Sequence, residues 1–194
     1  MPNWSYNEVF IDGAYEDLEA IRKQVERRFI WFDERENRVK IHTNSFSLHG
    51  IIPEPPEVFA QRKITCFSKE AKTEIEKLSF DYDNPANWYN WRNNHWGTKW
   101  DTRSAEVDLP EGSTTLSAFF DTAWCPPEPC FEELSRQYPN VTINLDCDVE
   151  GSGRWRVQWK AGQKMFDRPY LECEDILFNE ERQDNLPAAD RSIW

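Results

Sequence analysis

The stretch VTINLDCDVEGSGRWRVQWK, residues 141–160, alternates apolar and polar side chains on both sides of a loop that contains two glycines. The apolar residues occupy every second position from Val141 to Val149 and again from Trp155 to Trp159. Such alternation is typical of strands that have one face on a core and the other in water. We therefore predict an antiparallel hairpin that turns through Gly151-Ser152-Gly153, because three-residue loops with glycine are common hairpin connections.

The predicted register of this hairpin places polar residues opposite one another on its wet face, and these pairs are Glu150–Arg154, Asp148–Arg156 and Asn144–Lys160. On the covered face the same register pairs Val149 with Trp155 and Leu145 with Trp159. A slip by one residue would bury the charged residues, so the sequence specifies the face that each side chain takes. The residues expected beneath helices are Leu145, Cys147, Val157 and Trp159. The residues expected in water are Asn144, Asp146, Asp148, Arg154, Arg156, Gln158 and Lys160, joined by Phe119 of an earlier strand.

Two segments with helical periodicity supply the layer that covers this sheet. Leu18, Ile21, Val25 and Phe29 recur at intervals of three and four, which predicts a helix over residues 14–28 with one buried stripe. A second helix is predicted over residues 129–138, and further strands over 8–11, 105–109 and 115–124. This order predicts an α+β protein: a ferredoxin-like two-layer sandwich with a β-α-β-β-α-β core, an antiparallel sheet and a helical insertion.

We predict a single domain over residues 1–194. Its core strands and helices are expected in 3–31 and 103–161, with an insertion in 32–102 and a polar tail in 162–194. The insertion is inferred because Pro53-Glu54-Pro55-Pro56 suits neither a helix interior nor a central strand. Within the insertion, Ser68 is interpreted as the N-cap of a short helix. Asn84-Pro85 is interpreted as the start of another helix, which ends at Gly97.

Composition narrows the function classes. The chain is acidic, and its net charge of −12 makes nucleic acid an unlikely partner, since affinity for a phosphate backbone comes from lysine and arginine. Ten tryptophans and twelve phenylalanines predict an aromatic-rich core. The five cysteines form no C-x-x-C pair and the three histidines no zinc spacing, so we expect free thiols, no metal and no cofactor. The sequence shows neither a signal peptide nor a long apolar stretch, which predicts a cytoplasmic protein without a membrane partner.

Several short motifs outside the hairpin form a specific set. They are Ile51-Ile52-Pro53-Glu54-Pro55-Pro56, Trp88-Tyr89-Asn90-Trp91, Asn94 to Asp101, Phe120 to Pro127, Pro2-Asn3-Trp4, Asn7 and Leu134-Ser135. In these motifs the chain resembles the YubB ferredoxin-like domain family of uncharacterised enterobacterial plasmid and phage proteins. The resemblance implies a ferredoxin-like fold and an origin on a mobile genetic element, and it implies no activity. The chain departs from the family pattern at Ser5, where cysteine is usual, and at Cys125, where serine is usual.

The motif residues suggest one candidate ligand-binding site, where the loop after the tryptophan-rich helix would meet a central strand. Its members are Trp96, Lys99, Trp100, Asp101, Asp121 and Trp124. Aromatic walls would hold a ligand that one cation and two carboxylates orient. The structural interpretation carries more weight: the indoles fill the gap between insertion and sheet, and the charged residues bind backbone groups at turns.

Other constellations favour structural roles more strongly. Asn144, Asp146 and Asp148 share a strand face and could hold magnesium, but the arginines expected opposite them would compete for the carboxylates. Cys125 could be a nucleophile, yet no partner base can be assigned to it. His95 lies beside two tryptophans and is interpreted as a packing residue.

No catalytic residues emerge from this sequence, so we lean against an enzyme. The leading hypothesis is a protein-interaction module from a mobile element that binds a protein partner, and in its sharper form an acidic inhibitor of a host nucleic-acid-binding protein. One alternative is a small-ligand binder or enzyme that uses the region of Lys99, Asp101 and Asp121. A second alternative is a single-strand nucleic-acid binder that stacks bases on exposed rings, for which only Phe119 is expected on the wet face. The oligomeric state cannot be read from the sequence.

Overall fold

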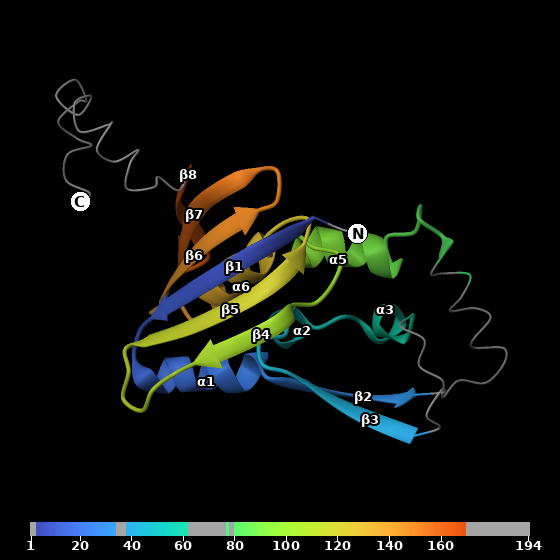
Figure 1. Cartoon of the computed structure of the whole chain (residues 1–194), viewed down its shortest axis with the longest axis horizontal. Helices are drawn as coiled ribbons and strands as arrows, with labels where there is room; N and C mark the ends of the chain where they lie inside the picture. The colour runs from blue at the N-terminus through green and yellow to red at the C-terminus, as the bar shows by residue number, and fades with distance from the viewer. Residues whose placement is uncertain (1–2, 34–37, 62–76, 78–79, 170–194) are drawn as a thin grey trace.

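A six-stranded antiparallel sheet in the order β4-β5-β1-β6-β7-β8 organises the fold (Figure 1). The structure is a computed structural model that describes residues 3–33, 38–61, 77 and 80–169. The strands of the sheet are β1 (Trp4–Asp12), β4 (Arg103–Asp108), β5 (Thr115–Ala123), β6 (Thr142–Val149), β7 (Gly153–Lys160) and β8 (Gln163–Pro169). The last strand, β8, lies at the start of the segment for which only a polar tail is predicted from the sequence.

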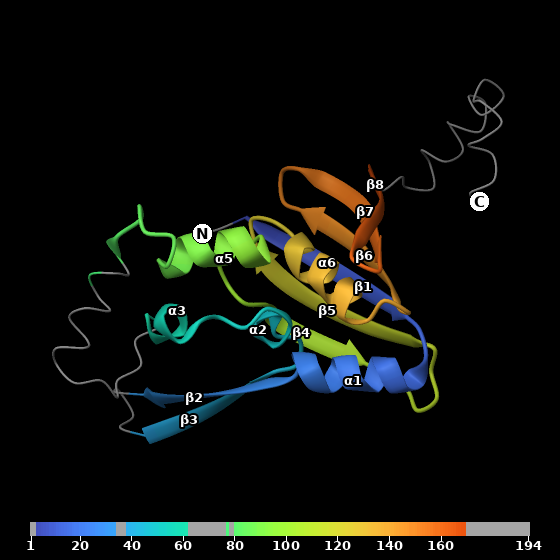
Figure 2. The ribbon, with the colours of Figure 1, turned by 180° about the vertical axis from the view of Figure 1, so that it is seen from behind.

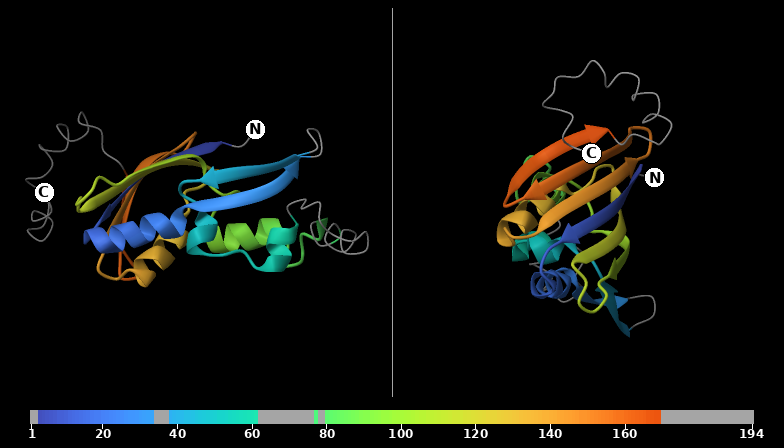
Figure 3. Two further views of the ribbon diagram at one scale, coloured as in Figure 1. Left: turned by 90° about the horizontal axis from the view of Figure 1, so that it is seen from below. Right: turned by 90° about the vertical axis from the view of Figure 1, so that its left-hand side faces the viewer.

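The connections between these strands confirm the predicted β-α-β-β-α-β plan. From β1 the chain passes through α1 (Tyr15–Val25) and further elements to β4, and β5 lies between the two strands in the sheet. From β5 the chain passes through α6 (Glu128–Gln137) to β6, and β1 lies between those two strands. Both helices lie on one face of the sheet, as the views from behind and from below show (Figures 2 and 3). This is the ferredoxin-like two-layer sandwich.

Helix α1 forms where the apolar stripe predicts it, but it ends earlier. Leu18, Ile21 and Val25 are fully buried, while the predicted fourth member, Phe29, belongs to strand β2 (Arg27–Asp33). Strand β2 is rich in aromatic residues and pairs with β3 (Arg38–Asn44) in a separate two-stranded sheet. Phe29 has the spacing of the helical stripe but lies in β2, because pairing with β3 outweighs the local periodicity there.

The β6–β7 hairpin has the predicted faces and a different register. Asp148 pairs with Arg154 and Asp146 with Arg156, so the register prediction is wrong by two residues. The loop comprises residues 150–152, where Gly151 adopts a φ of +80°, and Gly153 is already part of β7. A two-residue shift leaves every side chain on its own face, because the side-chain period of a strand is two. The four residues expected in the core, Leu145, Cys147, Val157 and Trp159, are accordingly buried.

The segment between α1 and β4 contains β2, β3, α2 (Leu48–Ile51), α3 (Pro56–Ala60) and α5 (Trp88–Trp96). Helix α5 is capped by Asn87, whose side chain accepts a hydrogen bond from the Tyr89 amide, and not by Asn84 as predicted. It ends at Gly97, which has the left-handed φ of +78° that the C-cap prediction requires. The predicted Ser68 helix and the tail from residue 170 lie outside the described residues, and the domain boundaries stay predictions.

Large aromatic rings join the two layers in the core. Phe46 from the inserted segment stacks on Phe120 of β5 with ring centroids 4.9 Å apart, and Phe131 of α6 lies 5.6 Å from Trp159 of β7. Trp96 is fully buried and donates a hydrogen bond from its indole nitrogen to the Ile52 carbonyl at 2.9 Å. The aromatic-rich core is as predicted, and it fixes the inserted helices against the sheet.

The buried thiols give a pH-dependent prediction. Burial raises the pKa of Cys147 to about 12 and also raises the pKa of Cys130, whereas Cys125 is exposed. In the unfolded chain these thiols ionise near their ordinary pKa of 9.0. Above that pH the native state binds more protons than the unfolded state, so the free energy of unfolding falls as the pH rises from about 9 towards 12. Urea denaturation across this range measures the decline.

Alkylation provides a second readout of the same burial. At pH 8, iodoacetamide is expected to modify Cys125 in the native protein while Cys130 and Cys147 stay protected until urea is added. Peptide mapping by mass spectrometry separates the three sites. Equal labelling of all three in the native protein would contradict their placement.

Candidate functional site: the open face of the sheet

The sheet face opposite the helices carries polar and aromatic side chains in a regular grid. Figure 1 looks onto this face, in front of which no helix is drawn. The strand registers align one row across five strands, namely Arg103, Asp121, Tyr6, Asp148 and Arg154. The next row contains Glu106, Phe119, Glu8, Asp146, Arg156 and Arg168. In the first row the arginines lie on β4 and β7 and the aspartates on β5 and β6. In the second row the arginines lie on β7 and β8, and the carboxylates lie on β1, on β6 and, with Glu106, on the edge strand β4.

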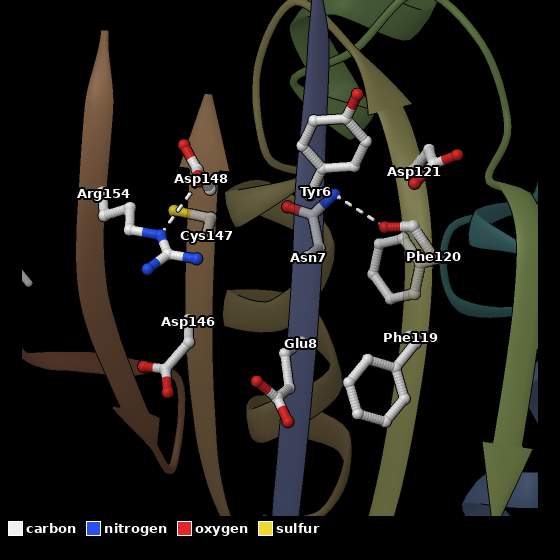
Figure 4. Close-up of a pocket in the computed structure, with 10 residues that line it drawn as sticks. All are labelled: Tyr6, Asn7, Glu8, Phe119, Phe120, Asp121, Asp146, Cys147, Asp148 and Arg154. Atoms are coloured by element: carbon white, nitrogen blue, oxygen red, sulfur yellow. Dashed lines mark hydrogen bonds and ion pairs between the residues drawn. The ribbon is translucent and has the colours of Figure 1, made fainter. Parts of the chain in front are cut away.

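A shallow pocket of about 430 Å³ lies at the centre of this face (Figure 4). Its lining residues come from four neighbouring strands and are Tyr6, Asn7, Glu8, Phe119, Phe120, Asp121, Asp146, Cys147, Asp148 and Arg154. Two rings stand up from its floor, since Tyr6 is 48% and Phe119 is 49% exposed. Half-exposed rings on β1 and β5, two neighbouring interior strands of the sheet, leave apolar surface available for contact.

Beneath the pocket a buried polar network holds the central strands in place. The Asn7 side-chain amide donates to the carbonyls of Ser5 and Phe120 and to the Thr122 hydroxyl at 2.9–3.2 Å. The Ser5 hydroxyl donates in turn to the Asn7 amide oxygen at 3.1 Å. Because these groups are hydrogen-bonded to one another, the network stabilises the pairing of β1 with β5 beneath the two rings.

The carboxylates of the pocket differ in their partners. Asp146 forms a two-pronged ion pair with Arg156, and Asp148 lies 2.9 Å from Arg154. Glu8 is directly opposite Asp146 on the neighbouring strand, and its side chain makes no hydrogen bond or ion pair within the described residues. Like charges placed directly opposite each other across two strands destabilise the pairing. The centre of the face therefore has an excess of negative charge.

Two residues of the first row, Asp121 and Tyr6, have shifted pKa values. Partial burial raises the pKa of Asp121, and the nearby Arg103 guanidinium opposes that shift. The Tyr6 hydroxyl donates a 2.9 Å hydrogen bond to Glu150, and this bond raises the pKa of Tyr6. The same hydrogen bond directs the phenol towards Glu150.

The six predicted site residues do not come together. Trp96 is fully buried in the core. Asp101 accepts hydrogen bonds from the Leu48 amide at 2.7 Å and the Ser47 hydroxyl at 2.6 Å at the start of α2, and from the Thr102 amide at 2.9 Å. Asp121 lies on the open face. Trp96 and Asp101 thus have the structural roles that were the alternative to a ligand-binding site: the indole packs in the core and the carboxylate binds backbone groups.

The remaining three predicted residues form a cluster at the edge of the open face. The Lys99 ammonium lies 4.2 Å from the ring centroid of Trp100 and 5.5 Å from that of Trp124. Trp100 also lies 6.1 Å from Trp4, over which the Arg103 guanidinium is placed. Cations over aromatic rings are a favourable arrangement. Of the two neighbours of this edge cluster that are not among the predicted site residues, Arg103 is directly opposite Asp121 of the pocket and Trp4 lies on β1 with Tyr6.

The structural role of Asp101 is directly testable. Asp101→Ala leaves the amides of Leu48 and Thr102 and the Ser47 hydroxyl without their acceptor, and we expect a loss of about 2 kcal/mol in the free energy of unfolding. Asp101→Asn keeps one acceptor oxygen and should lose less. Urea denaturation of both variants provides the measurement, and unchanged stability of Asp101→Ala would contradict the assignment.

The other sequence candidates are engaged in local contacts. Asn144 accepts a hydrogen bond from Gln158 at 2.7 Å, beside the paired Asp146. His95 stacks on Trp91 with centroids 4.3 Å apart, and its ring nitrogen contacts the Trp91 carbonyl. Within the residues that the structure describes, no group of three or more histidine, cysteine, aspartate or glutamate side chains could hold a metal ion.

Tyr6 and Glu8 are site residues that the sequence analysis misses. The first strand is predicted only from residue 8 onwards, although the alternation WSYNEVFID extends over the whole of β1. Extending this period of two back to Trp4 places Trp4, Tyr6 and Glu8 on one face. That signal would have identified a second ring beside Phe119.

The strand order and the two crossovers define the protein as a ferredoxin-like α+β sandwich. A family model described as a ferredoxin-like domain in Api92-like protein matches residues 95–185 of this chain. A crystal structure of the protein api92 from Yersinia pseudotuberculosis is similar to the whole arrangement, with a TM-score of 0.53 and 10% sequence identity over 89% of this chain and 99% of that chain. No curated protein matches the sequence. Within the described residues, no helix is long and apolar enough to cross a membrane.

Proposed function

We propose that this chain is a non-enzymatic protein-interaction module that binds a basic segment of another protein on the open face of its sheet. The observation that carries the proposal is the pair of half-exposed rings, Tyr6 and Phe119, set among four carboxylates at the centre of that face. Aromatic surface combined with negative charge suits lysine and arginine side chains, which bind both features.

The charge of the whole chain supports the same class of partner. A net charge of −12 attracts a basic protein over a distance and speeds the encounter, while it repels phosphate backbones. We further propose a cytoplasmic protein of a mobile genetic element, in keeping with its resemblance to the YubB family. In that setting the sharper form of the proposal is an inhibitor that occupies the basic groove of a host nucleic-acid-binding protein.

The positions of the charged motif residues favour binding over catalysis. Asp101 is engaged by backbone and hydroxyl groups of α2, Asp121 points to the open face, and Lys99 is held between two indoles. An enzyme would need such groups to converge on one reacting atom. Their separation supports an interaction surface instead.

A specific observation also favours a second candidate, a single-strand nucleic-acid binder. Tyr6 and Phe119 lie on the neighbouring interior strands β1 and β5, and exposed rings on neighbouring strands stack bases in other sheets. The carboxylates of Glu8, Asp121, Asp146 and Asp148 surround these rings and would repel the phosphates of a stacked strand. We therefore rank this candidate second.

One experiment separates the two candidates. The full chain is titrated into a fluorescein-labelled synthetic peptide of glycine, serine, lysine and arginine, and separately into a labelled single-stranded DNA. We expect the peptide to bind, and its affinity to fall about tenfold or more between about 50 mM and about 300 mM salt, because exposed charges are screened. The absence of peptide binding at low salt, or binding of the DNA instead, would overturn the proposal.

A further inference from the structure

We propose that the pocket between Tyr6 and Phe119 receives an arginine side chain of the basic partner, with Glu8 and Asp121 as its carboxylate partners. This inference rests on the proposed function and specifies the residue that the open face recognises. It follows from the distribution of charge, from the shape of the pocket and from the way the same sheet already binds its own arginines.

At the centre of the open face, the carboxylate of Glu8 has no cationic partner within the described residues. Strands β4, β7 and β8 supply arginines to the open face, β4 also carries Glu106, and the arginines of β7 pair with the carboxylates of β6. Glu8, one strand further in, has no such partner within the described residues and lies opposite Asp146. A guanidinium placed over Glu8 would neutralise this charge and remove the repulsion between the two opposed carboxylates.

The shape of the pocket suits a side chain that a polypeptide presents. Its volume of about 430 Å³ is at the small end for ligand sites, and it is open along the sheet instead of enclosed. Its two rings stand on adjacent strands, Phe119 directly opposite Glu8 and Tyr6 directly opposite Asp121. Each ring is therefore paired with a carboxylate, and a flat cation lying on a ring reaches that carboxylate with its edge.

Arginine fits this arrangement better than lysine. A guanidinium is planar, is weakly hydrated, stacks on aromatic faces and binds a carboxylate through two N–H groups at once. The protein already uses both contacts elsewhere: Arg156 binds Asp146 through two nitrogens, and Arg103 lies 5.0 Å from the centroid of the Trp4 ring. A lysine ammonium can also lie over a ring, as Lys99 does over Trp100, but it is a compact, strongly hydrated charge that cannot bind a carboxylate through a planar pair of N–H groups.

The test compares three labelled peptides that differ in one residue type: glycine-serine peptides carrying arginine, lysine or citrulline at the same positions. Citrulline keeps the shape of arginine and lacks its charge. For the wild-type chain at about 50 mM salt we expect the arginine peptide to bind about fivefold more tightly than the lysine peptide, and citrulline to abolish binding.

Variants of the chain locate the effect. Glu8→Gln should weaken binding of the arginine peptide about fivefold, and Phe119→Leu should remove most of its advantage over lysine. Glu111→Gln, in the exposed turn between β4 and β5, makes the same change in net charge away from the pocket and should leave binding within about twofold. Thermal melts by circular dichroism verify that each variant is folded.

The outcomes distinguish the inference from the proposed function. Equal binding of the arginine and lysine peptides, or Glu8→Gln and Phe119→Leu behaving as Glu111→Gln does, overturns the arginine site and leaves a general acidic docking face. Failure of the arginine and lysine peptides alike overturns the proposed function as well. Because the peptide comparison uses the wild-type chain, its result does not depend on the folding of a variant.

Discussion

The Arg92→Met variant is expected to lose about 3–5 kcal/mol of its free energy of unfolding, because it leaves the Glu54 carboxylate in the core without its guanidinium. The side chains of both residues are almost completely buried, and Arg92 Nε lies 2.6 Å from Glu54 Oε1. Arg92 also lies over the rings of Trp88 and Trp96 and donates to the Lys99 carbonyl. The pair thus connects α5 to the chain that precedes α3.

The double variant Glu54→Gln with Arg92→Met supplies the matched control for this prediction. Removing both charges avoids an uncompensated buried carboxylate, so much of the lost stability should return. Urea denaturation of the wild type, the single variant and the double variant gives the three free energies. A loss below about 1 kcal/mol for Arg92→Met would contradict the burial of the pair.

The second large effect concerns the two faces of the sheet. Trp159→Ala is expected to lower the free energy of unfolding by about 3–5 kcal/mol, because it empties a fully buried site against Phe131 of α6. Phe119→Ala truncates a large ring on the open face, where the side chain is half exposed, and should cost about 1 kcal/mol or less.

Chemical denaturation of these two variants measures their free energies of unfolding and so tests which face of the sheet is covered. The ratio of the two losses matters more than either value, since both substitutions remove a large ring from a strand of the same sheet. If Phe119→Ala were the more damaging variant, the assignment of the covered and the open face would be reversed.

The fold is predictable from the sequence because its deciding signal is local. The alternation in residues 141–160 determines which side of the sheet each residue takes, and this depends only on the two-residue period of a strand. The register is not predictable in the same way, because a shift by two residues preserves every face. It is set by the conformation of the loop, in which Glu150 precedes Gly151 and Gly153 joins the strand.

The predicted site is harder to place because its residues straddle a boundary between core and solvent. Trp96 is in the last turn of α5 and faces inward, and the left-handed Gly97 then redirects the chain so that Trp100 lies at the surface. Asp121 lies between buried Phe120 and buried Thr122 on β5, so it takes the opposite face. Proximity in sequence carries no information about these directions.

Tyr6 and Glu8 could have been found from the sequence, and their neighbours across the sheet could not. The alternation along β1 predicts which face the Tyr6 side chain takes. The pairing of β1 with β5 and β6, in contrast, joins residues more than 100 positions apart. The pocket exists only through those pairings. Its charge excess therefore becomes visible only once the strand order is known.

The most direct test of the binding face is nuclear magnetic resonance with the isotope-labelled full chain and the arginine peptide. We expect the peptide to shift the amide signals of residues around Tyr6 and Glu8 on β1 and around Phe119 and Asp121 on β5, and to leave those of α1 and α6 unchanged. Shifts confined to the helical layer, or none at peptide concentrations that saturate the fluorescence titration, would show that this face does not bind basic partners.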